Sequence, residues 1–185
     1  MVVHQLVVDD DGTLDPIPVK TVVEKLSHET ALEPAVITDT IIHDGTCFQL
    51  SGDGYEFVQF ETLESDARIE ADVTGFGQQD LFGIGFAPDT ENVSALNYVF
   101  NIKENSVEFY NTEDFLDAEP ESYMDCELAG KDSVHLTILS GGGVASLYVD
   151  DELALTARMY RSQGTAWQLF GVNSTVKWEN AAVYR

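Results

Sequence analysis

Hydrophobic and polar residues alternate along most of this chain with a period of two, which is typical of β-strands that bury one face. The segment 67–74 (ARIEADVT) alternates without a break. It predicts a strand whose apolar residues face a core, while Arg68, Glu70 and Asp72 share the opposite face. A strand of this kind belongs in a sheet that packs on one side only.

Turn residues separate the other alternating segments. Further strands are predicted at 96–103, 107–110, 133–139, 144–149, 153–159, 166–172 and 175–184. Glu104–Asn105 and the glycines of 141–143 lie between neighbouring segments and favour hairpins. About a dozen short strands at this spacing predict an all-β fold, a two-sheet antiparallel β-sandwich of the concanavalin A-like jelly-roll type.

The N-terminal segment has a different pattern. Pro18 precedes the segment 19–27, whose valines and leucine recur at spacings of three and four, so we predict a short helix there. Because valine favours strands, a strand is the alternative. The turn at Asp11–Gly12 predicts that residues 2–17 form a strand pair or an extended arm. We therefore expect an arm and linker over 1–30 and a sandwich over 31–185.

Composition excludes several classes of partner. The 33 acidic and 9 basic side chains give a net charge of −24, whereas nucleic acids and anionic membranes attract basic surfaces. The hydrophobic fraction of 44% is enough for a core. No apolar run approaches the ~18 residues of a spanning helix, and no signal peptide begins the chain. The acidic bias indicates either a salt-adapted surface or an ordinary acidic one, and we favour the latter.

Motifs for metal and redox chemistry are weak. The four histidines are scattered singly, and the stretch 9–15 (DDDGTLD) lacks the ligand spacing of a calcium loop, so no metal site is expected. Cys47 and Cys126 could form one disulfide, but two unrelated thiols is the favoured interpretation.

Motifs for catalysis are also incomplete. Glu70 and Asp72 lie on one predicted strand face, as carboxylates do in some sandwich-fold glucanases. The third carboxylate of that pattern is missing, so no acid/base pair is formed. No nucleophile elbow or phosphate loop is present. Gly83 and Gly85 are interpreted as a strand approached closely by other backbone.

Aromatic and arginine residues in the strands remain as candidates for sugar binding. Trp167 and Trp178 could stack on sugar rings, although tryptophan is more often a core residue. Arg68 and Arg158 lie within predicted strands, where arginine pairs with carboxylates or grips hydroxyl groups. The acidic segment 111–121 is interpreted as a solvated connector, with a binding loop as the alternative.

Four segments of the C-terminal third carry a family resemblance. They are DSVHLTI at 132–138, ASLYVDD at 145–151, LTARMY at 155–160 and WQLF at 167–170. Together they resemble the C-terminal β-sandwich of glycoside hydrolase family 32, which contains fructan hydrolases, invertases and sucrose-6-phosphate hydrolases. The opening, from HQL at 4–6 to PVK at 18–20, is similar to the segment that leaves the catalytic propeller of that family. The resemblance spans nearly the whole chain.

The resemblance does not imply that this chain has the hydrolase activity of the family. Catalysis in that family resides in an N-terminal five-bladed propeller with Asn-Asp-Pro, Arg-Asp-Pro and Glu-Cys motifs. Here the Asp-Pro pair at Asp15–Pro16 follows Leu14, and Cys126 follows Asp125. We therefore expect no catalytic residues, no cofactor and no enzyme activity in this chain as it stands.

Related sandwiches include carbohydrate-binding modules of family 66, which bind the terminal fructose of levan. The resemblance thus implies a fructan-binding module, with a catalytic propeller as the second partner. The alternatives are a support or dimerisation domain without sugar binding and, less favoured, a sandwich-fold hydrolase. Strand position and residue type select the candidate sugar-binding residues Arg158, Tyr160, Asp150, Glu108, Tyr110 and Trp167. The parent enzyme would be secreted if it cleaves polysaccharide and cytoplasmic if it cleaves sucrose 6-phosphate.

Overall fold

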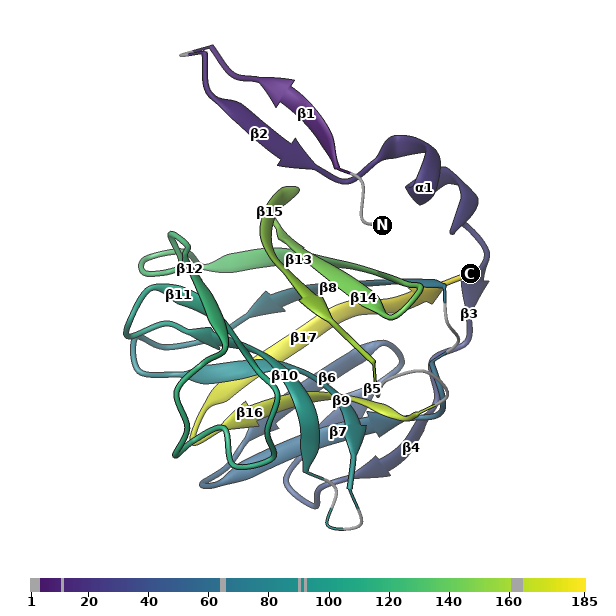
Figure 1. The fold of residues 1–185 in the computed structure, drawn as a ribbon. Coiled ribbons are helices and arrows are strands. Elements are labelled where there is room, and N and C mark those ends of the chain that lie inside the picture. The colour runs from purple at the N-terminus through teal and green to yellow at the C-terminus, as the bar shows by residue number, and fades with distance from the viewer. Residues whose placement is uncertain (1–3, 11, 64–65, 90, 92, 161–164) are drawn as a thin grey trace.

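Alternating side chains along the strands build two large antiparallel sheets that pack face to face (Figure 1). The computed structural model describes residues 4–10, 12–63, 66–89, 91, 93–160 and 165–185. The two-sheet antiparallel sandwich predicted from the sequence is confirmed. The predicted turn at Asp11–Gly12 lies partly outside the described residues, because Asp11 is not among them.

The first sheet has seven strands. In spatial order they are β12 (Ser122–Asp125), β11 (Ser106–Tyr110), β10 (Ser94–Asn101), β9 (Leu81–Pro88), β16 (Trp167–Val172), β7 (Tyr55–Phe60) and β4 (Pro34–Ile37). The predicted hairpin at Glu104–Asn105 is present between β10 and β11. Asn105 has a φ of 58°, a conformation that asparagine tolerates better than most residues.

The second sheet has eight strands. They are β15 (Glu152–Arg158), β14 (Val144–Val149), β13 (Ser133–Gly141), β8 (Ala67–Thr74), β17 (Thr175–Tyr184), β6 (Cys47–Ser51) and β5 (Ile42–Asp44), with β3 (Glu29–Thr30) also paired to β17. Strand β8 has the bounds predicted for it, and its residues alternate between buried and half-buried. Arg68, Glu70 and Asp72 therefore lie on the outer face of this sheet, as predicted.

The core lies between the sheets and is rich in aromatic residues. Trp167 stacks on Phe60 with 4.5 Å between ring centroids, and Trp178 meets Phe82 edge-on at 5.8 Å. Both tryptophans are fully buried, so their interpretation as core residues is confirmed. Gly83 allows the closest approach, because a Cβ there would lie 2.0 Å from the backbone oxygen of Tyr98.

A second apolar cluster lies on the outer face of the seven-stranded sheet. It contains Phe57, Val99, Tyr110, Phe115, Phe170 and Val172. Phe115 comes from the connector 111–121 and packs 5.5 Å from the Phe170 ring. The connector predicted to be solvated thus contributes an anchor that covers part of this sheet face.

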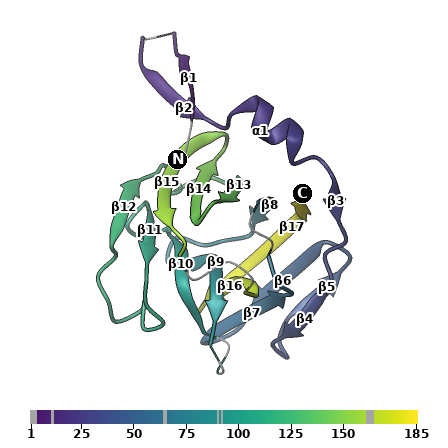
Figure 2. The ribbon, with the colours of Figure 1, turned by 45° about the vertical axis from the view of Figure 1, so that its right-hand side comes forward.

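An arm precedes the sandwich. Strands β1 (Gln5–Val8) and β2 (Leu14–Ile17) form a separate two-stranded sheet, and α1 (Lys20–Lys25) follows them. The predicted helix is therefore confirmed, and the strand alternative is wrong. Figure 2 shows the hairpin projecting away from both sheets, with β2 in contact with β15 near its base. The last two residues of the segment predicted as arm and linker, Glu29 and Thr30, form β3 and pair with β17 of the eight-stranded sheet.

Two further features of the described residues bear on function. Cys47 and Cys126 are free thiols, so the interpretation without a disulfide holds. No helix within the described part of the chain is long and apolar enough to cross a bilayer.

Candidate functional site

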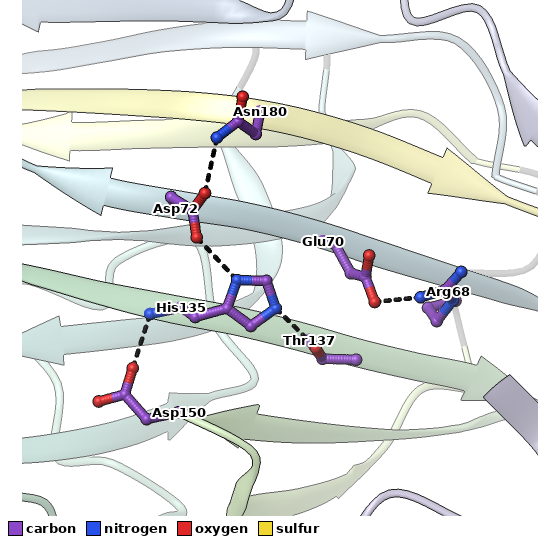
Figure 3. Close-up of polar contacts among 7 residues, drawn as sticks. All are labelled: Arg68, Glu70, Asp72, His135, Thr137, Asp150 and Asn180. Carbon is purple, nitrogen blue, oxygen red and sulfur yellow. Dashed lines mark hydrogen bonds and ion pairs between the residues drawn. The ribbon is translucent and has the colours of Figure 1, made fainter. Parts of the chain in front are cut away.

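A row of polar side chains crosses the outer face of the eight-stranded sheet (Figure 3). Asp72 on β8 accepts hydrogen bonds from Asn180 Nδ2 on β17 at 2.7 Å and from His135 Nδ1 on β13 at 2.7 Å. The hydrogen bond from Asn180, together with His135, holds the pKa of the Asp72 carboxyl below its usual value. Because a carboxylate only accepts, Nδ1 is the protonated nitrogen of His135 in this pair.

Arg68 lies on the same face, one row further along β8. Its guanidinium pairs with Glu70, and its carbon lies 3.9 Å from the ring centroid of Tyr184. Its Nε donates to the backbone oxygen of Leu26 at 3.0 Å, immediately after α1. This arginine therefore fastens the base of the arm to the sheet through its Nε, while Nη1 pairs with Glu70.

The polar row does not form a catalytic pair. The carboxylate of Glu70 is engaged by Arg68, and that of Asp72 by Asn180 and His135. General acid catalysis in a glycosidase needs a protonated carboxyl, whereas the pKa of Asp72 is lowered. No group of three or more metal-ligating side chains comes together among the residues that the structure describes.

A groove of about 470 Å³ opens between α1 and the β13–β14 hairpin. Its apolar lining comes from Val22, Leu26, Leu139, Val144 and Tyr148, and its polar lining from Lys25, Asp66 and Ser146 with the turn 140–142. The groove is therefore mainly apolar, with a few polar groups at its rim.

The base of the hairpin borders this groove. His4 Nδ1 forms a hydrogen bond with Tyr148 Oη at 2.8 Å, and the two rings meet edge-on. Tyr148 is consequently buried although it lies on the outer face of its sheet.

Two of the predicted sugar-binding residues lie at the edge of this face. Arg158 ends β15, and its Nη1 donates to Tyr160 Oη at 2.5 Å. Both side chains are exposed, Tyr160 to 72%. The β13–β14 turn lies close to this pair. A Cβ built on Gly143 in that turn would be 3.8 Å from Cδ1 of the Tyr160 ring. The pair is accessible and lies close to the groove.

Asp150 lies at the other end of the same sheet and has structural partners. Asp150 and Asp151 form the β14–β15 turn with φ values of 50° and 70°, the conformation of a two-residue hairpin. The Asp150 carboxylate accepts from the His135 backbone nitrogen at 2.8 Å and from Lys131 Nζ at 2.5 Å.

Glu108 and Tyr110 share one face of β11, as predicted, but this face belongs to the opposite sheet. Glu108 accepts hydrogen bonds from Ser106 Oγ at 2.8 Å, Asn101 Nδ2 at 3.1 Å and Tyr110 Oη at 2.6 Å. Burial and the neighbouring Glu108 raise the pKa of Tyr110. Both residues are about nine-tenths buried.

The six predicted residues are therefore spread over four places. Trp167 lies in the core, Glu108 and Tyr110 lie on the seven-stranded sheet, and the other three lie at two ends of the eight-stranded sheet. Only Arg158 and Tyr160 are in contact and exposed. Sequence reasoning missed His4 and His135, whose isolated positions in the chain carried no signal of their partners.

Comparison with known proteins adds to this geometry. The model of the C-terminal domain of BT1760-like proteins of glycoside hydrolase family 32 matches residues 12–181. No curated protein matches the chain.

Three solved structures share the fold. The carbohydrate binding module CBM66 from Bacillus subtilis has 20% identity and a TM-score of 0.59, covering 86% of this chain and 98% of its own. The β-fructofuranosidase of Aspergillus kawachii has 14% identity and a TM-score of 0.65, covering 97% of this chain and 32% of its own. The exo-inulinase of Aspergillus awamori has 12% identity and a TM-score of 0.60, covering 98% and 34%.

These likenesses define what the chain is similar to. It spans about a third of the two enzymes and nearly all of the module. The matching family model describes a C-terminal, non-catalytic domain, and it covers most of the sequence. The chain therefore belongs to the family of BT1760-like C-terminal domains of glycoside hydrolase family 32.

Proposed function

We propose that this chain is a support domain that joins and packs against the catalytic β-propeller of a family 32 glycoside hydrolase. The β1–β2 hairpin is the observation that carries the proposal. It pairs with neither sheet of the sandwich, and Leu6, Val8 and Leu14 on it are 60%, 65% and 56% exposed. An isolated two-stranded hairpin is marginally stable in water. Further strands or a packing surface from another domain would stabilise it.

The direction of the hairpin is fixed, which suits a joint between two domains. The hydrogen bond of His4 with Tyr148 holds its start, and the Arg68 hydrogen bond to Leu26 holds the segment that follows it. A flexible linker would need neither contact. The polar face beside the hairpin would then lie next to the propeller.

The pattern of similarity supports the same partner. The two enzyme structures cover 97% and 98% of this chain, whereas the carbohydrate binding module covers 86%. The two enzymes thus match about a tenth more of the chain than that module does. The arm is the part of the chain that leaves the sandwich, and it is of similar length.

Calorimetry tests this function. The chain would be compared alone and fused after a family 32 catalytic domain, and we expect its unfolding temperature to be higher in the fusion. The double substitution Leu6→Asp and Leu14→Asp should remove that gain. Ile42→Asp is the matched control, because Ile42 is 64% exposed on the far strand β5. An equal unfolding temperature in both proteins would reject the proposal. Self-association of the chain that the double substitution abolishes would indicate a dimerisation domain.

Binding of fructose units is a second candidate function, proposed at Arg158 and Tyr160. The guanidinium of Arg158 is held by the Tyr160 hydroxyl, and both groups are open to solvent. An arginine fork next to an exposed aromatic ring can hold sugar hydroxyls and stack on a sugar face. The likeness to a carbohydrate binding module supports the same idea at the level of the fold.

Isothermal titration with levan, inulin and fructose tests sugar binding. We expect Arg158→Ala and Tyr160→Ala to remove the binding heat. Tyr123→Ala should leave it unchanged, since Tyr123 is similarly exposed but lies on the other sheet. Binding heat that persists in both variants would place the sugar site elsewhere on the chain. If the folded wild-type chain gave no binding heat with any of these sugars, sugar binding would be rejected and only the support function would remain.

A further inference from the structure

The helix α1 lies over the groove without burying any of its own residues. Val22, Val23 and Leu26 give it an apolar side, yet none of the residues of α1 is buried. A helix of six residues has little stability of its own and depends on burial of an apolar face. Among the residues that the structure describes, none completes that burial.

The floor of the groove is apolar as well. Leu139 and Val144 come from the two strands of the β13–β14 hairpin, and Tyr148 closes the end next to the arm. The volume of about 470 Å³ is enough for more than one large apolar side chain. An apolar groove of this size has an unfavourable surface in water and is a suitable contact site for another apolar surface.

The position of the groove indicates which partner would fill it. Tyr148 both lines the groove and holds His4 at the start of the hairpin. The groove is thus continuous with the surface that we assign to the catalytic domain. In the part of the chain that the structure describes, its rim carries one cation and one anion, Lys25 and Asp66, so this lining favours no strongly charged ligand.

We infer that the groove between α1 and the β13–β14 hairpin receives an uncharged, apolar loop of the catalytic domain, which locks α1 onto the sheet. This inference rests on the proposed support function and adds a second contact to the hairpin. The hairpin alone would leave a pivot between the domains. A loop in the groove would remove that pivot, because it would contact the helix and the sheet together.

Hydrogen exchange tests the inference and the proposed function separately. Backbone exchange would be measured in the chain alone and in its fusion to a family 32 catalytic domain. We expect exchange in α1 and in the turn 139–144 to be about ten-fold slower in the fusion, together with slower exchange in β1 and β2. Protection of β1 and β2 without protection of α1 and the turn would overturn the inference and leave the support function in place. If none of these segments were protected, both would be rejected.

A pair of variants distinguishes a loop that contacts the groove directly from a general loss of flexibility of the chain in the fusion. In the fusion, Val144→Asp should remove the protection of α1 and of the turn while β1 and β2 stay protected. Val36→Asp is the control, because it makes the same change at a partly exposed valine on the distant strand β4. Unchanged protection of α1 in Val144→Asp, with a folded sandwich, would contradict a loop seated in the groove.

Discussion

The Nε of Arg68 donates a hydrogen bond to the backbone oxygen of Leu26 at 3.0 Å, so the middle of the eight-stranded sheet holds the end of α1. The Arg68 side chain is only 11% exposed and also pairs with Glu70. Replacing it by methionine would leave a carbonyl and a carboxylate without their donors. We expect Arg68→Met to lower the free energy of unfolding by about 2 kcal/mol, measured by urea titration. Arg158→Met, at an exposed arginine, should change it by less than about 0.5 kcal/mol.

The close contact at Gly83 gives a second prediction. A methyl group there would meet the Tyr98 backbone oxygen and the Phe170 ring, at 2.0 Å and 2.6 Å. Backbone in the middle of a sheet has little freedom to move, so Gly83→Ala should cost about 3 kcal/mol or prevent folding. Gly77→Ala is the control, since its nearest neighbour would lie at 3.7 Å. Similar unfolding midpoints for the two variants would contradict this packing.

The three hydrogen bonds of Glu108 predict a structural role for it. Glu108→Ala would leave the donors of Asn101, Ser106 and Tyr110 without their acceptor, and we expect a loss of about 3 kcal/mol. Tyr110→Phe removes one donor only and should cost about 1 kcal/mol. If levan titration shows binding, Tyr110→Phe should keep it. A folded Tyr110→Phe variant that no longer binds levan would indicate that the face of β11 with Glu108 and Tyr110 takes part in sugar binding.

The hydrogen bonds of Asp72 predict a dependence of stability on pH. Because its pKa is lower in the folded chain than in the unfolded chain, the carboxylate stabilises the fold above the usual carboxyl pKa of about 4. This contribution is lost as the pH falls through the lowered value. Asp72→Asn should therefore be less stable than the wild type at pH 7, and the difference should shrink below about pH 4. A difference that stays constant from pH 7 to pH 3 would contradict the assignment.

The net charge of −24 predicts stabilisation by salt. Like charges at the surface repel each other over about 30 Å at 0.01 M salt but only about 8 Å at 0.15 M. We expect the unfolding temperature to rise over this range and to approach a plateau. Sodium and potassium chloride at equal ionic strength should raise it alike, because screening depends on ionic strength. A midpoint that continues to rise in molar salt would favour the salt-adapted interpretation of the acidic composition.

The sequence predicted the strands well because their signal is local. The alternation along 67–74 identifies both the strand and its outer face, and Arg68, Glu70 and Asp72 lie there as expected. Gly83 was also interpreted as a close approach, and the Tyr98 backbone provides it. Such features depend on residues a few positions apart or on the size of one side chain.

Which of the candidate sugar-binding residues lie together in space could not be predicted in the same way. Strands β15 and β16 are neighbours in the chain but belong to opposite sheets, so Arg158 at the end of β15 and Trp167 on β16 do not share a surface. Glu108 and Tyr110 do share a face, but Phe115 from a loop that looked solvated packs next to Tyr110. Both outcomes depend on contacts between residues far apart in sequence, which alternation does not encode.

The pairing of β3 with β17 also has a mechanical consequence. His28 and Arg185 exchange two backbone hydrogen bonds, of 3.0 Å and 2.9 Å, where the arm enters the sheet. A pulling force applied between the arm and Arg185 would therefore be carried by this short ladder and by the Arg68 contact. Tension between the two ends would unzip the junction before it reached the tryptophans between the sheets.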